Sequence, residues 1–147
     1  MERIKIETHI NVRVETIWNA YNSAEDIMQW NHASDDWHCT SSINDLRIGG
    51  KFKNRMEAKD GSMGFDFEGS YAALEPFKKI AYVMPDGRHV EINFNAKKSA
   101  TDITIIFDAE TENPIDMQRN GWQAILENFR SYVENTYATT QLGQSHE

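Results

Sequence analysis

Apolar and polar residues alternate from Lys51 to Asp108, and a spacing of three and four residues replaces this alternation from Asn113 to Tyr137. Alternation places one face of a β-strand in a core, whereas the longer period gives an α-helix an apolar stripe. The second segment therefore predicts one long helix, with Asn113 as its N-cap and Pro114 in its first turn. Its apolar stripe consists of Trp122, Ile125, Leu126, Phe129, Tyr132 and Val133.

Two short helices are predicted near the N-terminus, after a first strand. Residues 4–12 alternate as a strand, residues 13–21 have helical spacing, and Ser23 fits the N-cap of a helix over Ala24–Met28. Further strands are predicted over Trp37–Asn44, Lys51–Glu57, Phe65–Tyr71, Ile80–Met84, Val90–Ala96 and Ile103–Phe107. We therefore expect an α+β fold in which a curved antiparallel sheet of about six to seven strands wraps around the long C-terminal helix. The two short helices follow the first strand.

Composition narrows the class of protein further. The chain has 147 residues, for which we expect a single domain over residues 1–138 and a flexible polar tail over 139–147. A net charge of −8 argues against nucleic acid and against an anionic membrane surface as partners. The N-terminus has no apolar stretch typical of a signal peptide, and no segment approaches the roughly 20 apolar residues of a membrane span. We expect a cytoplasmic protein without an intramolecular disulfide, because Cys39 is the single cysteine.

A sheet that wraps around a helix often leaves a cavity between them, and large side chains on the predicted inner faces are candidates for its walls. The same residues also suit an ordinary hydrophobic core. Trp30 and Trp37 flank a polar loop, either as aromatic walls at a cavity mouth or as packing for the loop. Asn54 shares the inner face of its strand with hydrophobes, so its amide must bond a neighbour, a water or a ligand. The predicted ligand-binding residues are Trp30, Trp37, Asn54, Met56, Phe65, Phe67, Tyr71, Tyr82, Gln118 and Trp122.

Four titratable residues lie within a stretch of seven positions in and just after this polar loop: His32, Asp35, Asp36 and His38. Such a group is typical of acid–base catalysis or metal binding, but histidine and aspartate also favour loops for their own sake. The spacing matches no standard zinc pattern, and no Ser-His-Asp order or phosphate loop stands out, so we expect no metal and no cofactor. The catalytic candidates are His32, Asp35 and His38, with Tyr71 or Asn54 orienting a substrate.

Several motifs resemble the activator-of-heat-shock-chaperone-ATPase homologue family, within the START/birch-pollen-allergen (SRPBCC) superfamily. They are Val14–Trp18, Trp30, the segment DLRIGGKF at 45–52, Gly69–Tyr71, Ile80–Tyr82 and Gly121–Phe129, and the resemblance extends from Ile4 to about Tyr137. It implies a helix-grip fold with a cavity between the sheet and the long helix. Members of the superfamily include stimulators of chaperone ATPases, binders of lipids and polyketides, and a few cyclases and hydrolases.

Binding of a small hydrophobic or aromatic molecule in this cavity is the leading functional prediction. An acid–base enzyme of the cyclase or hydrolase type, acting in the same cavity, is the first alternative. The second alternative is an interaction module that stimulates a chaperone ATPase. The eukaryotic chaperone activators have an additional N-terminal domain without a counterpart in this sequence, which favours the ligand-binding reading. A chaperone partner and a homodimer are both left open.

Overall fold

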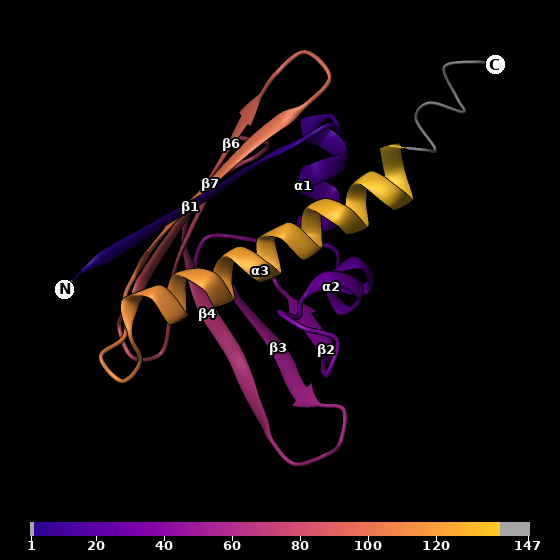
Figure 1. The fold of residues 1–147 in the computed structure, drawn as a ribbon. Coiled ribbons are helices and arrows are strands. Elements are labelled where there is room, and N and C mark those ends of the chain that lie inside the picture. Colours follow the sequence, from indigo (N-terminus) through magenta and orange to yellow (C-terminus); the bar gives the residue numbers. More distant parts are fainter. Residues whose placement is uncertain (1, 139–147) are drawn as a thin grey trace.

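The computed structural model describes residues 2–138 and contains a seven-stranded antiparallel sheet that curves around a long helix (Figure 1). In chain order, the elements are β1 (Arg3–Ile10), α1 (Val14–Asn22), α2 (Ala24–Trp30), β2 (Trp37–Asn44), β3 (Lys51–Ala58), β4 (Gly64–Glu75), β5 (Lys79–Val83), β6 (His89–Ala96), β7 (Thr101–Asp108), α3 (Ile115–Val133) and a π-helical turn, η1 (Glu134–Ala138). The strand order is β1-β7-β6-β5-β4-β3-β2, so β2 to β7 form a meander and β1 pairs with its last strand. The predicted helix-grip α+β fold is confirmed.

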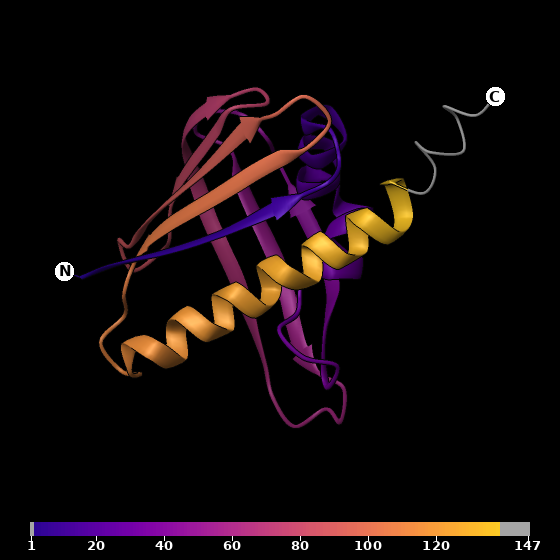
Figure 2. The same cartoon turned by 45° about the horizontal axis from the view of Figure 1, so that its top comes forward.

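Helix α3 lies across the concave face of the sheet, as both ribbon views show (Figures 1 and 2). Its side chains at Leu126, Phe129 and Val133 are at most 2% exposed, and they join the main hydrophobic core. The other three predicted stripe residues are partly buried against the same core. The predicted apolar stripe is therefore the face that holds α3 on the sheet.

The ends of the helices differ from the predicted ends. Pro114 occupies the N-cap of α3 with an extended ψ of 147°, so the predicted N-cap, Asn113, lies one residue outside the helix. The reason is local, because the carbonyl of Asn113 accepts a hydrogen bond from Gln118 Nε2 at 2.8 Å. The predicted helix also changes to a π-helical turn after Val133. Ser23 is the N-cap of α2 as predicted, although without a side-chain capping bond, and α2 extends to Trp30.

Glycines allow the tight turns between the strands. Gly61 and Gly87 each follow an aspartate in a turn between two strands, and their φ values of 78° and 92° are ones that residues with a side chain rarely adopt. Gly50 is required for a different reason, since a Cβ on it would lie 2.2 Å from the carbonyl oxygen of Asp45. The paired glycines of the 45–52 motif thus allow the close backbone approach before β3.

None of the helices within residues 2–138 is long and apolar enough to cross a membrane. The expected domain limits of 1–138 stay a prediction. The polar tail expected over 139–147 lies outside the described residues.

Candidate functional site

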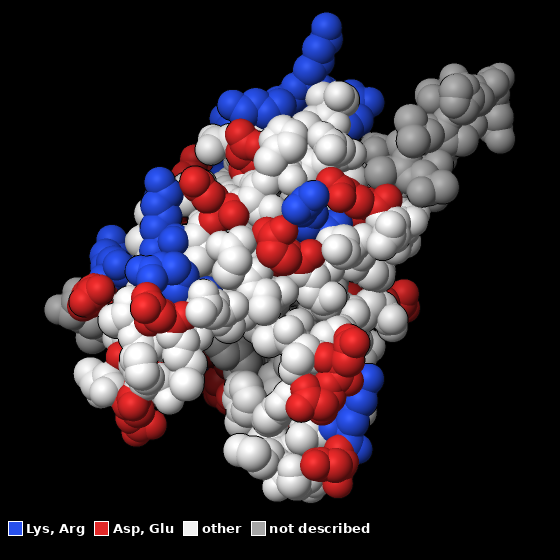
Figure 3. All heavy atoms as spheres, in the orientation of Figure 1, with Lys and Arg blue, Asp and Glu red and all other residues white. Residues whose placement is uncertain are grey.

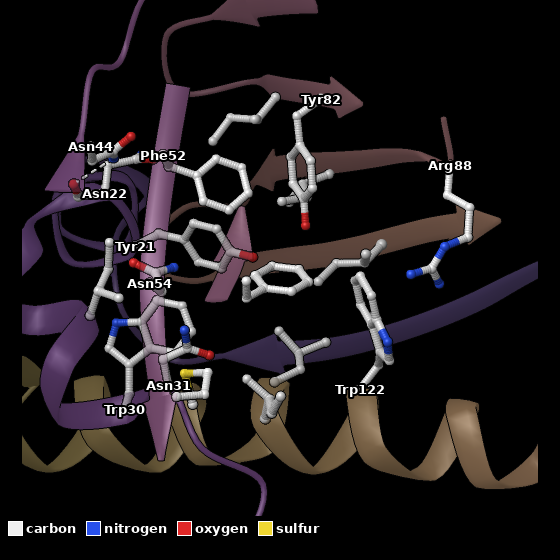
Figure 4. Close-up of a pocket in the computed structure, with 18 of the residues that line it drawn as sticks. Tyr21, Asn22, Trp30, Asn31, Asn44, Phe52, Asn54, Tyr82, Arg88 and Trp122 are labelled. Carbon is white, nitrogen blue, oxygen red and sulfur yellow. Dashed lines mark hydrogen bonds between the residues drawn. The ribbon is translucent and has the colours of Figure 1, made fainter. Parts of the chain in front are cut away.

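A cavity of about 360 Å³ lies between the sheet and α3 (Figure 4). Strands β2 to β7 and all three α-helices contribute to its lining. Its apolar wall is formed by Ile27, Phe52, Met56, Phe67, Ile80, Ile92, Ile105, Trp122, Ile125 and Leu126. The volume falls within the roughly 300–1,000 Å³ that is usual for small-molecule sites, and a mainly apolar wall is also usual there.

The cavity opens to solvent beside the N-terminal end of α3. The space-filling view shows a hollow between that end of the helix and the lobe formed by β3 and β4, with mostly uncharged walls (Figure 3). Phe65 on β4 is 51% exposed, and Asn113 before α3 is also exposed, although both line the cavity. These residues mark the entrance.

Four polar groups point from the walls into the cavity: the hydroxyls of Tyr21 and Tyr82 and the amides of Asn31 and Asn54 (Figure 4). Asn54 is 7% exposed, and its Oδ1 accepts a hydrogen bond from Ser42 Oγ at 2.6 Å. The Nδ2 of Asn54 and the two hydroxyls have no hydrogen-bond partner among residues 2–138. Burial raises the pKa of Tyr21 and of Tyr82 above the ordinary tyrosine value, so both hydroxyls keep their protons at neutral pH. Asn54 Nδ2 and the two hydroxyls are therefore free to bond a ligand.

Other polar side chains in the cavity lining already make hydrogen bonds within the protein. Tyr71 Oη donates to Asn44 Oδ1 at 2.5 Å, and Asn44 Nδ2 in turn donates to a backbone carbonyl of α1 at 2.9 Å. Gln118 accepts a bond from the Glu110 N–H at 2.9 Å, and its Nε2 donates to the carbonyls of Glu110 and Asn113. Tyr71 ties β4 to β2, and Gln118 fixes the loop before α3.

Every predicted ligand-binding residue except Trp37 lines the cavity. Trp37 packs against Phe65 instead, with ring centroids 5.8 Å apart. The expected position of Trp30 at the mouth is wrong, because its side chain is only 5% exposed and contacts Phe129 at a centroid distance of 4.8 Å. The cause is the length of α2, which continues to Trp30 and directs the indole into the core. A role in ligand binding stays a prediction for each of these residues.

The catalytic candidates His32, Asp35 and His38 are not among the lining residues. Asp35 is exposed, whereas His38 is half-buried on β2. His32 contacts α3, with its Nε2 3.1 Å from Asn128 Nδ2. Within residues 2–138, no group of three His, Cys, Asp or Glu residues could hold a metal ion. The acid–base alternative stays a prediction, and its three residues do not meet at the cavity.

We expect His32 to make the stability of the fold depend on pH. Asn128 Nδ2 also donates to the carbonyl of Trp30 at 2.7 Å, and His32 Nδ1 is buried without a partner among the described residues. Burial lowers the pKa of His32 below its usual 6.5, so the unfolded chain takes up this proton first as the pH falls. The contribution of His32 to stability is therefore present above about pH 6.5 and is lost as the pH falls below it.

We expect the free energy of unfolding of the wild type to fall more steeply than that of His32→Gln between about pH 7.5 and about pH 5. Urea unfolding at both pH values measures this difference. His89→Gln is the matched control, since His89 is exposed on β6, and it should follow the wild type. An equally steep fall in His32→Gln would contradict the assignment to His32.

Sequence reasoning missed three lining residues that matter for the chemistry: Tyr21, Phe52 and Arg88. Phe52 could have been found, because it alternates in phase with Asn54 on the same strand. Tyr21 was assigned to the apolar face of a helix, where a buried hydroxyl looks like core. Arg88 directly follows a hairpin turn, and nothing in the local pattern indicates that its side chain turns inward.

Gly69 shapes one wall of the cavity. It pairs with Phe52 across β3 and β4, and a Cβ on it would lie 2.8 Å from ring atoms of both Phe52 and Tyr82. The absence of a side chain lets these two rings meet edge to face, with centroids 4.7 Å apart. The glycine of the 69–71 motif thus has a packing reason beside the cavity.

Comparisons with known proteins agree with this geometry. A family model described as "Activator of Hsp90 ATPase homolog 1-like protein" matches residues 11–134. The chain is 45% identical to an AHSA1-like protein from Aeromonas hydrophila, whose solution NMR structure matches with a TM-score of 0.86 over 91% of this chain and 93% of that chain. A solution structure from Cytophaga hutchinsonii matches at 43% identity with a TM-score of 0.79, covering 90% of this chain and 92% of the other.

A third solved structure is similar to this chain in fold only. The crystal structure of a protein from Chromobacterium violaceum has a TM-score of 0.81 at 20% identity, covering 91% of this chain and 99% of that chain. The comparison with curated proteins finds no match. The family model and the two relatives above 40% identity together show that this chain belongs to the Activator of Hsp90 ATPase homolog 1-like family.

Proposed function

We propose that the protein binds a small, largely apolar or aromatic molecule in the cavity between the sheet and α3. The observation that supports this most directly is the set of free polar groups of Tyr21, Asn54 and Tyr82 on an otherwise apolar wall. These groups face the cavity space, so a ligand that bonds them replaces water, whereas a ligand that covers them without bonding them loses about 1–3 kcal/mol per group. An apolar cavity with a few convergent polar groups is the usual form of a small-molecule site.

The two alternative functions receive less support. The acid–base candidates lie away from the cavity lining, as described above. The family description refers to activation of the Hsp90 ATPase, and exposed Met63, Phe65 and Met117 are apolar side chains of the kind that a partner protein could contact. Phe65, however, also lines the cavity, so its exposure is equally explained by the entrance. Stimulation of a chaperone ATPase and formation of a homodimer both stay predictions.

A neutral fluorescent probe, N-phenyl-1-naphthylamine, tests the proposal directly. We expect saturable binding of one probe molecule to the wild type and binding at least about fivefold tighter to Asn54→Leu. The physical reason is that the probe covers the free Nδ2 of Asn54 without offering it an acceptor, and leucine removes this cost of about 1–3 kcal/mol. Fluorescence titration measures both affinities.

Asn95→Leu is the matched control, because it makes the same chemical change on an exposed position of β6 outside this cavity. Its probe affinity should equal that of the wild type. Native mass spectrometry of freshly purified protein should in addition reveal a bound small molecule. Failure of the wild type to bind the probe saturably would overturn the proposal, and equal affinities in Asn54→Leu and the wild type would overturn the assigned position.

A further inference from the structure

Arg88 is the cationic side chain among the residues that line the cavity. It leaves the turn between β5 and β6 directly after Gly87, and its guanidinium is directed toward Trp122 and the interior (Figure 4). The side chain is 21% exposed, which places it at the margin between the cavity and solvent. A cation held in such a position is a candidate partner for a charged ligand group.

The hydrogen bonds that Arg88 makes within the protein hold its side chain but leave the end of the guanidinium unpaired. Its Nε donates to Asp86 Oδ2 at 2.7 Å, and its backbone N–H donates to Asp86 Oδ1 at 3.2 Å. The two terminal nitrogens, Nη1 and Nη2, have no partner among residues 2–138. Two parallel N–H donors at the end of a guanidinium match the two oxygens of a carboxylate. Asp86 is 55% exposed, so solvent screens its charge more than that of Arg88.

The remaining polar groups of the wall supply further donors. Asn54 Nδ2 can only donate, the protonated hydroxyls of Tyr21 and Tyr82 can each donate or accept, and the amide of Asn31 can do both. Glu110 is the carboxylate of the lining, and its Oε1 already accepts a bond from the Asn113 N–H at 2.7 Å. The charge of Arg88 also opposes the burial-driven rise in the pKa of Tyr82, consistent with a guanidinium that faces the interior.

We expect the charged group of a ligand to lie at the cavity entrance and not deep inside the cavity. Burial of an ionised group away from water is very costly unless it is paired, whereas an apolar body gains from burial. The chain as a whole has a net charge of −8, so an anion is held by direct contact and not by long-range attraction.

We infer that the ligand is a largely apolar carboxylic acid, with its apolar body inside the cavity and its carboxylate bound by Nη1 and Nη2 of Arg88. This inference rests on the proposed function, because it concerns the chemical class of the molecule that the cavity binds. Acceptor atoms on the apolar body would meet the donors of Tyr21, Tyr82 and Asn54.

Two competitors of nearly equal shape test the inference, namely biphenyl-4-carboxylate and biphenyl-4-carboxamide. Each displaces N-phenyl-1-naphthylamine at about pH 7.5, where the acid is ionised, and calorimetry measures the direct binding of each. We expect the wild type to prefer the carboxylate by about tenfold, the usual order for a charge-assisted pair. Arg88→Gln should bind the two equally, and Arg88→Lys should retain a smaller preference, because lysine keeps the charge but lacks the fork.

Arg47→Gln is the control, since Arg47 is 76% exposed, pairs with Asp45 and lies outside the cavity lining. It should keep the full preference, and a thermal melt shows whether each variant is folded. If Arg88→Gln does not fold, the reduced preference of Arg88→Lys decides the matter. The inference is overturned if the wild type binds the probe but does not prefer the carboxylate, or if both Arg88 variants keep the full wild-type preference. Either result leaves the proposed function intact. Absence of binding of the probe and both biphenyls overturns the two together.

Discussion

A chain that ends at Asn113 is expected to show no cooperative unfolding transition. It lacks α3, whose Leu126, Phe129 and Val133 are at most 2% exposed in the folded protein. Complete burial of such side chains contributes about 1.5–3 kcal/mol each, and the partly buried members of the stripe add to this. The sum is comparable with the whole stability of a typical domain, about 5–15 kcal/mol. Without α3, the concave face of the sheet would also expose its apolar side chains to water.

Circular dichroism during heating and during urea titration measures the transition. A chain that ends at residue 138 is the control, because it keeps α3 and lacks only the polar segment 139–147. This control should melt within a few degrees of the full chain, and a larger loss would mean that the segment contributes to the fold. A cooperative transition in the shorter chain would show that the sheet does not depend on α3.

Most of the fold could be predicted because it depends on local patterns. The period of each strand, the change of period at the long helix and the aspartate–glycine turns are all properties of neighbouring residues. The structure accordingly has seven strands and places the stripe of α3 inward. The end of a helix is less predictable, as Asn113 shows, because the bonds of Gln118 decide where α3 begins.

The polar chemistry of the cavity was less predictable, because it depends on contacts between distant segments. Asn54 was identified from its place among hydrophobes on one strand, which is a local signal. Tyr21 and Arg88 come from a helix and a turn that only the folded sheet brings together with Asn54. Irregular register in the sheet adds to this, since the pairing shifts between Cys39 and Ser41 on β2 and has a second shift on β4. Such shifts change which side chains face inward, and the alternation pattern does not show them.

Trp30 and Trp122 both line the cavity, but they differ in burial and in contacts. Trp30 is 5% exposed, lies 5.0 Å from Tyr21 and 4.8 Å from Phe129 by ring centroids, and donates its Nε1–H to the carbonyl of Ala20 at 3.1 Å. Trp122 is half-buried and stacks on Phe107 at 3.9 Å. A position of Trp30 at the cavity mouth, one of the two alternatives from the sequence, would instead make Trp30 the less buried of the two residues.

We therefore expect Trp30→Ala to lower the free energy of unfolding by about 3–5 kcal/mol, the usual cost of removing a large aromatic side chain from a core. Trp122→Ala should lower the free energy of unfolding clearly less, because its side chain is only half-buried. Relative to its loss of stability, Trp122→Ala should weaken binding of N-phenyl-1-naphthylamine more than Trp30→Ala does. Urea unfolding and probe titration of both variants measure the two effects. Trp18→Ala is the control for losing a buried indole outside the cavity lining, because Trp18 packs against Phe77 and Phe94, and it should leave probe affinity unchanged. A larger stability loss in Trp122→Ala than in Trp30→Ala would contradict the placement of Trp30 in the core, since only a buried, hydrogen-bonded indole leaves both a void and an unpaired carbonyl when it is removed.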